Sequence, residues 1–288
     1  MKYEGTVYRP PSEARSWILQ ATIGCSHNRC TFCSMYKDKS FRIRKTDEII
    51  QEIHEARSVY GNLRRIFIAD GDALMISTDN LLHIIRELRN TFPECERIGI
   101  YASPGSIHLK SKEELQDLRE AGLGIAYLGL ESGSDRILQI VKKGDRKEGI
   151  VSAGRKVKEA GLELSVTVIS GLGGREHWQE HARETAHAVN LIKPDYLGLL
   201  TLMIEPGTEL WDQVQAGEFS LLTPYEIAQE TLLMLKNLDS PGCVFRSNHA
   251  SNYVALKGTL NRDRDEMIST LQNALVDGDF KEEWMRKL

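Results

Sequence analysis

Short apolar runs alternate with longer amphipathic stretches over most of this 288-residue sequence. The first amphipathic stretch places Ile49, Ile53 and Ala56 on one helical face. Strands that alternate with helices pair in parallel through right-handed crossovers, so the pattern indicates an α/β fold. The predicted strands are residues 16–23, 65–69, 97–102, 125–131, 163–169 and 196–202.

Six strand–helix units are two fewer than the eight of a complete barrel. We therefore expect a partial (β/α)6 TIM-like barrel formed by residues 16–210. Residues 1–15 are interpreted as an N-terminal extension, and residues 211–288 as a C-terminal extension that helps to close the barrel. No Pro-, Gly- or Ser-rich linker divides the sequence into separate domains.

Helix-capping patterns support this reading of the elements. Ser111 followed by Glu114 predicts a capping box, and residues 223–226 offer an N-cap threonine, a first-turn proline and an acid at the third position. Gly122 and Gly161 each stand where a helix should end and a strand begin. The predicted strands are thus bounded by independent helix signals.

Composition narrows the class of protein. The formal net charge is −4 and no basic patch stands out, which argues against a nucleic-acid partner. The N-terminus lacks the apolar core of a signal peptide and no run of 18 apolar residues occurs, so we expect a cytoplasmic protein with no membrane partner. Three of the five cysteines crowd into nine residues, which indicates metal binding rather than disulfides.

The crowded cysteines, Cys25, Cys30 and Cys33, follow the first predicted strand and are separated by four and then two residues. Three thiolates are one ligand short of a closed tetrahedral site. Two alternatives follow. His27 completes a structural zinc site, or the missing ligand leaves one iron of a [4Fe–4S] cluster open to another molecule.

The loop IGCSHNRCTFCSMY resembles the cluster-binding loop of the radical S-adenosylmethionine (SAM) superfamily, in which Phe32 before the third cysteine is also typical. There, SAM chelates the open iron, and an electron passed through the cluster releases a 5′-deoxyadenosyl radical. The commonest spacing in that superfamily is three and then two residues, so the extra residue here is interpreted as a subfamily mark. The resemblance implies that Cys25, Cys30 and Cys33 hold a [4Fe–4S] cluster that binds SAM.

Further segments resemble SAM-binding segments of the same superfamily, and they follow successive strands, where the chemistry of α/β barrels gathers. Asp70, Gly71 and Asp72 take the place of the segment that receives the SAM ammonium group, although a helix N-cap turn is an alternative. Met35 and Tyr36, just beyond the cysteines, either contact SAM or shield the cluster from solvent.

Glu131 and Ser132 lie in GLESGSDRIL, which resembles a segment shared by the oxygen-independent coproporphyrinogen oxidases and the Elongator catalytic subunit. In those enzymes the glutamate approaches SAM. Ser170 and Gly171 begin a glycine-rich turn whose backbone is expected to approach the adenine and ribose. The segment MIEPGTEL, residues 203–210, is similar to the same group of enzymes.

The C-terminal stretch FRSNHASNYVALKGTLNRD resembles a radical SAM subgroup without an assigned reaction. Its density of hydrogen-bonding side chains predicts either a substrate site or a polar loop. The candidate substrate residues are Arg246, Asn248, His249, Asn252 and Tyr253.

Two other motifs carry less weight. Residues 37–45 include five basic side chains, which form either a solvated face or a docking site for a flavodoxin or ferredoxin electron donor. HWQEH, residues 177–181, matches a zinc-peptidase signature, but so short a match in a helix with three histidines is better explained as a surface or barrel-rim helix.

The sequence therefore predicts a radical SAM enzyme that abstracts hydrogen from a small-molecule or cofactor-precursor substrate. One alternative is a radical SAM enzyme that modifies RNA, which the absence of a basic accessory region disfavours. The other is a zinc or iron–sulfur protein without catalysis.

Overall fold

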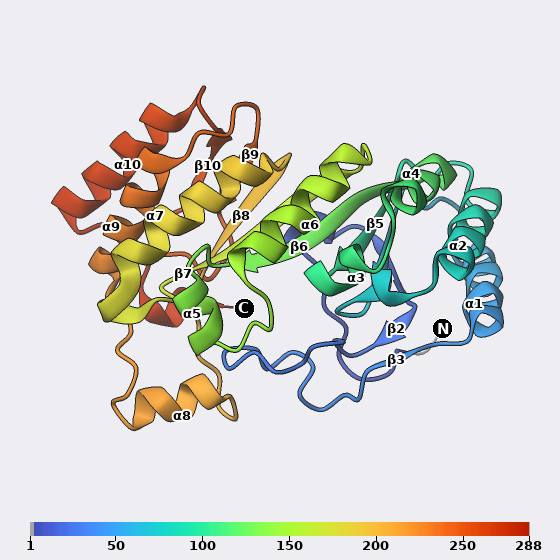
Figure 1. Cartoon of the computed structure of the whole chain (residues 1–288), viewed down its shortest axis with the longest axis horizontal. Helices are drawn as coiled ribbons and strands as arrows, with labels where there is room; N and C mark the ends of the chain where they lie inside the picture. Colours follow the sequence, from blue (N-terminus) through green and yellow to red (C-terminus); the bar gives the residue numbers. More distant parts are fainter. Residues whose placement is uncertain (1–2, 288) are drawn as a thin grey trace. The chain divides into compact units, whose positions relative to one another are not determined.

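The computed structural model describes residues 3–287, which divide into two compact units (Figure 1). Among these residues, unit 1 comprises residues 3–28, 35–128 and 156–164. Unit 2 comprises residues 29–34, 129–155 and 165–287. The chain therefore crosses from one unit to the other several times, and it does so within the cysteine loop.

Unit 1 is built on parallel strands that pair in the order β1, β4, β5 and β6. Strand β4 is RIFIA, buried along nearly its whole length, as expected of a parallel strand covered on both faces. In Figure 1 the helices α1, α2 and α4 of unit 1 lie side by side. The bounds are β1 (Trp17–Gln20), β4 (Arg65–Ala69), β5 (Arg97–Ala102), β6 (Leu123–Glu131), α1 (Thr46–Val59), α2 (Thr78–Thr91) and α4 (Lys112–Ala121).

A buried polar contact fastens the N-terminal segment to this sheet. Glu13 is fully buried and accepts hydrogen bonds from Arg97 Nη2 at 2.6 Å and from the Tyr127 hydroxyl. Burial, and then the bond to Glu13, raises the pKa of Tyr127 above its usual range. Gly99 lets the Phe67 and Tyr127 rings pack closely, because a Cβ there would lie 3.2 and 3.3 Å from them.

Unit 2 continues the same design with strands β7, β8 and β9 in parallel, and β10 antiparallel to β9. Helix α9 packs against α7 and α10, and the three gather beside these strands in Figure 1. The bounds are β7 (Glu163–Ser170), β8 (Tyr196–Thr201), β9 (Val244–Ser247), β10 (Leu256–Thr259), α7 (Gly174–Ile192), α9 (Pro224–Asn237) and α10 (Arg264–Asp277).

The remaining elements are short connections, apart from α6. They are η1 (Pro11–Glu13), β2 (Thr22–Ile23), β3 (Arg42–Ile43), η2 (Ala73–Met75), α3 (Pro104–His108), α5 (Asp135–Ile140), α6 (Lys147–Glu159), α8 (Glu209–Gln215) and η3 (Glu283–Met285). Within residues 3–287, no helix is both long and apolar enough to cross a membrane.

The predicted α/β fold with a mostly parallel sheet is confirmed. Strands 65–69 and 97–102 have the predicted bounds, and Ser111 and Thr223 form the expected capping boxes. The predicted strand 16–23 is interrupted at Ala21, whose N–H donates to Ala69 O at 2.6 Å, and β2 then pairs with β3 instead. The C-terminal residues add β9 and β10, two strands that the sequence pattern did not reveal.

Candidate active site

The cysteine loop follows β2 and contributes to both units: Cys25 belongs to unit 1, and Cys30 and Cys33 to unit 2. All three side chains are partly exposed, and no disulfide joins cysteines in the described residues. Across residues 3–287, no three His, Cys, Asp or Glu side chains are already gathered around one point. The cluster ligands therefore stay a prediction, which rests on the chemistry of three thiolates in one short loop.

Gly71 packs directly against this loop within unit 1. Its N–H donates to Gly24 O at 3.1 Å. A Cβ on Gly71 would lie 2.7 Å from Tyr36 Cε2 and 3.0 Å from Cys25 Cβ, so only glycine fits without displacing them. The structure thus brings together three of the predicted site residues: Gly71, Cys25 and Tyr36.

Asp70 is fully buried beside the same loop. Its Oδ2 accepts hydrogen bonds from Lys39 Nζ at 2.9 Å, Gln20 Nε2 at 3.1 Å and Gly24 N at 3.2 Å. Its Oδ1 is buried and has no hydrogen-bond partner. A buried carboxylate oxygen without a donor is costly, so this atom is suited to a hydrogen-bond donor that arrives with a ligand.

Asp72 is also fully buried, but its carboxylate is committed. It accepts from the Ser26 hydroxyl, from Ser103 Oγ at 2.7 Å and from Ser103 N at 3.1 Å. Ser103 in turn is the N-cap of α3 and forms a capping box with Ser106. Asp72 does not cap the turn η2 that follows it, so its role is to join the start of α3 to the cysteine loop through Ser26.

Lys39 was not predicted as a site residue, yet it lies at the centre of this arrangement. Its Nζ pairs with Asp70 and lies 5.5 Å from the centroid of the buried Tyr36 ring, which meets Tyr8 edge to face. Met35 is only partly buried. Three of the four other basic side chains of residues 37–45 also pair with carboxylates inside unit 1: Arg42 with Glu4, Arg44 with Glu52, and Lys45 with Glu48.

In unit 2, Glu131 ends β6 with a left-handed backbone, φ +60°. Its Oε1 accepts from Lys143 Nζ at 2.9 Å, and both side chains are largely buried. Ser132 is fully buried and does not point to solvent, because its hydroxyl lies 2.8 Å from His181 Nδ1 on α7. The two neighbouring predicted residues therefore have different environments.

His181 is held between two fixed partners. Its Nε2 lies 3.0 Å from Ile169 O, and because a carbonyl only accepts, Nε2 carries the proton. Nδ1 then accepts from the Ser132 hydroxyl. Burial lowers the pKa of His181 to about 4, so the ring is neutral near pH 7. With both nitrogens engaged, His181 is unavailable as the zinc ligand that HWQEH suggests.

The turn after β7 is supported by Glu230 of α9, a second residue that the sequence did not single out. Glu230 Oε1 accepts from Ser170 Oγ at 2.6 Å and from Gly171 N at 2.7 Å. Glu230 is fully buried, its Oε2 has no hydrogen-bond partner, and burial raises its pKa to about 7. The Ser170 hydroxyl is thus turned toward α9, while the Gly171 backbone follows with φ +84°.

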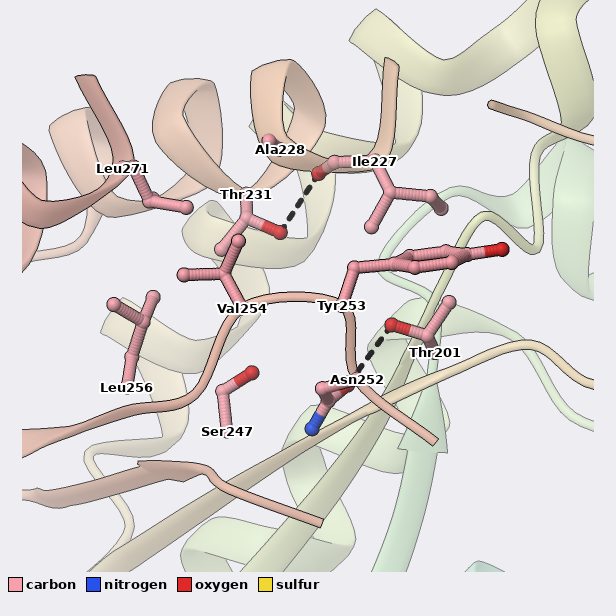
Figure 2. A pocket seen from close by; sticks show the side chains of 10 residues that line it. All are labelled: Thr201, Ile227, Ala228, Thr231, Ser247, Asn252, Tyr253, Val254, Leu256 and Leu271. Carbon is pink, nitrogen blue, oxygen red and sulfur yellow. Dashed lines mark hydrogen bonds between the residues drawn. The ribbon is translucent and has the colours of Figure 1, made fainter. Parts of the chain in front are cut away.

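The five candidate substrate residues separate in the structure. Asn252 and Tyr253 line a small cavity of about 10 Å3 at the end of β8, where Thr201 Oγ1 donates to Asn252 Oδ1 at 2.9 Å (Figure 2). Tyr253 lies between Thr201 and Ile227 in this view. By contrast, Arg246 and Asn248 are exposed, and His249 bonds to Ser251 at 2.9 Å. Two of the five therefore face a cavity.

Comparison with known proteins identifies the family. Residues 19–187, more than half of the chain, match the model of the radical SAM superfamily. The chain belongs to the radical SAM superfamily. Membership confirms the predicted class of enzyme, and the superfamily uses a [4Fe–4S] cluster and SAM.

The relatives of this radical SAM chain include proteins of the group that its sequence resembles, the coproporphyrinogen oxidases and the Elongator catalytic subunit. The heme chaperone HemW of Bacillus subtilis (strain 168) is 20% identical over 76% of the chain and 58% of the relative. The structure of coproporphyrinogen III oxidase (HemN) from Escherichia coli aligns with TM-score 0.58 at 19% identity, over 77% of this chain and 54% of that one.

The archaeal Elp3 of Methanocaldococcus infernus, with an N-terminal deletion, aligns with TM-score 0.53 at 17% identity, over 81% of this chain and 58% of that one. These structural likenesses establish the shared TIM-like α/β fold. The chain spans about half the length of the curated relatives it matches.

Proposed function

We propose that this radical SAM protein abstracts a hydrogen atom from a small-molecule or cofactor-precursor substrate. When bound, the cluster and SAM supply the 5′-deoxyadenosyl radical that removes the hydrogen. The chain's own residues hold the cofactors in place, orient the substrate and exclude water. The observation that carries the proposal is the contact of Gly71 with Cys25 and Tyr36, because it joins the cysteine loop to the turn after β4.

The buried, unpartnered Oδ1 of Asp70 supports the assignment of the ammonium group of SAM to this turn. An ammonium group offers three donors and a positive charge, which an orphaned carboxylate oxygen needs. Lys39 Nζ donates to Oδ2 of Asp70 and leaves Oδ1 without a donor. In this proposal Asp70 accepts from the ammonium group, Gly71 allows the loop to close on it, and Asp72 fixes the turn. Tyr36 shields the cluster from solvent, with Met35 beside it.

On unit 2, Glu131 and the Ser170–Gly171 turn are proposed to hold the sugar and base of SAM. Lys143 fixes Glu131, and Glu230 fixes the turn through its bonds to Ser170 Oγ and Gly171 N. Ser132 acts through His181 and positions Glu131 rather than touching the ligand. A turn with two anchored atoms presents a defined surface for a nucleoside.

The electron is proposed to come from a flavodoxin- or ferredoxin-type protein. The basic residues 37–45 are a poor docking site for it, because Lys39, Arg42 and Arg44 already pair with carboxylates.

The net charge of −4 favours a small-molecule substrate over RNA, because RNA-binding proteins usually present a positively charged surface.

Anaerobic reconstitution followed by electron paramagnetic resonance tests the proposal. We expect the reduced cluster signal to change when SAM is added, and iron binding to be lost in Cys25→Ala, Cys30→Ala and Cys33→Ala. Cys95→Ala and Cys243→Ala are the matched controls, since both thiols are buried elsewhere and should keep the iron content. A signal that is indifferent to SAM would contradict the proposal.

A further inference from the structure

A cavity of about 180 Å3 lies within unit 2, beside the end of β8 and the start of α9. Most of its lining is apolar, and Gly171 of the proposed nucleoside-binding turn also lines it. An apolar cavity of roughly 150 Å3 is enough to bind benzene. This cavity therefore fits a benzene-sized ring or a branched aliphatic chain. Its apolar lining includes Leu202, Met203, Ile204, Leu221, Leu222 and Ile227.

One positively charged side chain, Arg286, also lines this mostly apolar cavity. The Arg286 side chain is only 4% exposed, and its guanidinium group lies 4.1 Å from the centroid of the Tyr253 ring. Nε donates to Ser251 O at 2.6 Å and Nη2 donates to Leu202 O at 2.9 Å. These contacts fix the orientation of the group, and Nη1, which also donates to the Tyr253 hydroxyl at 2.5 Å, faces an anion.

The anion that now occupies Nη1 is the carboxylate of Glu283, at 2.6 Å for Oε1 and 2.8 Å for Oε2. The Tyr253 hydroxyl donates to the same carboxylate at 2.6 Å. The partners differ sharply in exposure, because the Glu283 side chain is 69% exposed. An exposed carboxylate regains water when it leaves, whereas a buried guanidinium needs a counter-charge. Glu283 is thus replaceable, but the negative charge is not.

We infer that this cavity binds a small carboxylate with a benzene-sized or branched apolar group, whose carboxylate takes the place of Glu283 on Arg286. The Tyr253 hydroxyl then donates to the ligand instead of to Glu283, and the apolar wall receives the carbon skeleton. The charge balance at Arg286 is unchanged by this exchange. The inference that this ligand binds the cavity is independent of the proposed function. The further step, that the ligand is the substrate, rests on the proposed function.

Calorimetric titration of the cluster-loaded full chain tests the exchange. The probes are 4-methylpentanoate, its uncharged amide and acetate, which separate the two features of the ligand. We expect 4-methylpentanoate to bind at least about tenfold more tightly than either of the others. Glu283→Gln removes the competing charge and should tighten binding of the acid about tenfold, with little change for the amide.

Glu282→Gln is the matched control, because it removes the same charge from the neighbouring exposed position without touching the Arg286 pair. Equal tightening in both variants, or equal affinity for the acid and the amide, would overturn the inference. Arg286→Lys should weaken binding of the acid alone. The cluster's response to SAM is recorded in parallel, so a failure of the radical SAM proposal is seen separately from a failure of carboxylate binding.

Discussion

Two buried carboxylates, one in each unit, support a turn at the end of a strand, and they do so by different electrostatics. Asp70 in unit 1 has a cation, Lys39 Nζ, at 2.9 Å as well as two neutral donors. Within residues 3–287, Glu230 in unit 2 accepts hydrogen bonds from two neutral donors, the Ser170 hydroxyl and Gly171 N. His181 Nε2 lies 4.0 Å from it, but that ring is neutral near pH 7.

The difference lies in what compensates each buried carboxylate. Asp70 is an ion pair that needs its partner, whereas Glu230 has its pKa raised to about 7 by burial and exchanges a proton near neutrality. The turn beside the cysteines is therefore held by an ion pair, and the turn after β7 is held by a group that titrates.

The largest expected effect comes from removing the cation of unit 1. Lys39→Met leaves Asp70 buried without a counter-charge, so the free energy of unfolding should fall by about 3–5 kcal/mol. Urea denaturation measures it. Combining the change with Asp70→Asn should recover part of the loss. If the double variant is no more stable than Lys39→Met, loss of the ion pair does not explain the lower free energy of unfolding.

The two turn glycines offer a second contrast. Gly71→Ala places a Cβ 2.7 Å from the Tyr36 ring and 3.0 Å from Cys25 Cβ, which should cost about 1–3 kcal/mol and lower the iron content. Gly171→Ala meets only the end of the Ile227 side chain at 2.9 Å and a left-handed backbone, so about 1–2 kcal/mol is expected with normal iron content. Iron analysis and thermal unfolding separate the two.

The dependence of stability on pH tests the titrating turn. With a folded pKa of about 7 against 4.5, Glu230 gives the folded state extra protons, so its contribution falls as pH rises through this range. His181, with a folded pKa of about 4 against 6.5, contributes stability that is lost as pH falls from 6.5 toward 4. The two slopes offset each other between about pH 4.5 and 6.5.

Glu230→Gln keeps an acceptor for Ser170 and Gly171 but removes the titration. Between about pH 4.5 and 7, the stability of this variant relative to the unmodified protein should therefore rise by about 1.4 kcal/mol per pH unit. Chemical denaturation at several pH values measures the slope. An unchanged profile would show that Glu230 does not titrate in this range.

The smallest effects are expected at two exposed capping boxes, Ser111 in unit 1 and Thr223 in unit 2. Ser111→Ala and Thr223→Ala each remove the side-chain acceptor of a helix N-terminus, at Glu114 N and Glu226 N respectively. Each should cost about 1 kcal/mol. Both caps are exposed and neutral, so the two units should respond alike here, in contrast to their buried carboxylates.

The sequence reveals where the strands end more readily than it reveals the buried groups that support the turns after them. Asp70, Glu131 and Ser170 were found because each stands where an apolar run stops, and the structure places each at or just after a strand end. Lys39 could not be separated from the basic run around it. Its burial depends on a distant partner, since its Nζ pairs with Asp70 at 2.9 Å, and Asp70 lies 31 residues further along the chain.

Glu230 did leave a signal, although a weak one. In PYEIAQETLLMLKN it lies between Ile227 and Met234 at helical spacing, so a charged residue interrupts the apolar face of α9. Strands β9 and β10 left none, because VFRS and LKGT lack the apolar runs of the other strands and form only by pairing onto β8 and each other. Long-range pairing of this kind has no local sequence pattern.

The titrating carboxyl of Glu230 also makes the turn after β7 a reporter of ligand charge. A positively charged molecule settling beside Ser170 and Gly171 would favour the ionised carboxylate, lower the pKa of Glu230 and expel its proton into the medium. The heat of binding near pH 7 would then vary with the ionisation enthalpy of the buffer. A neutral molecule bound at the same place would give the same heat of binding in every buffer. The dependence of this heat on the buffer would therefore show whether the bound ligand is charged.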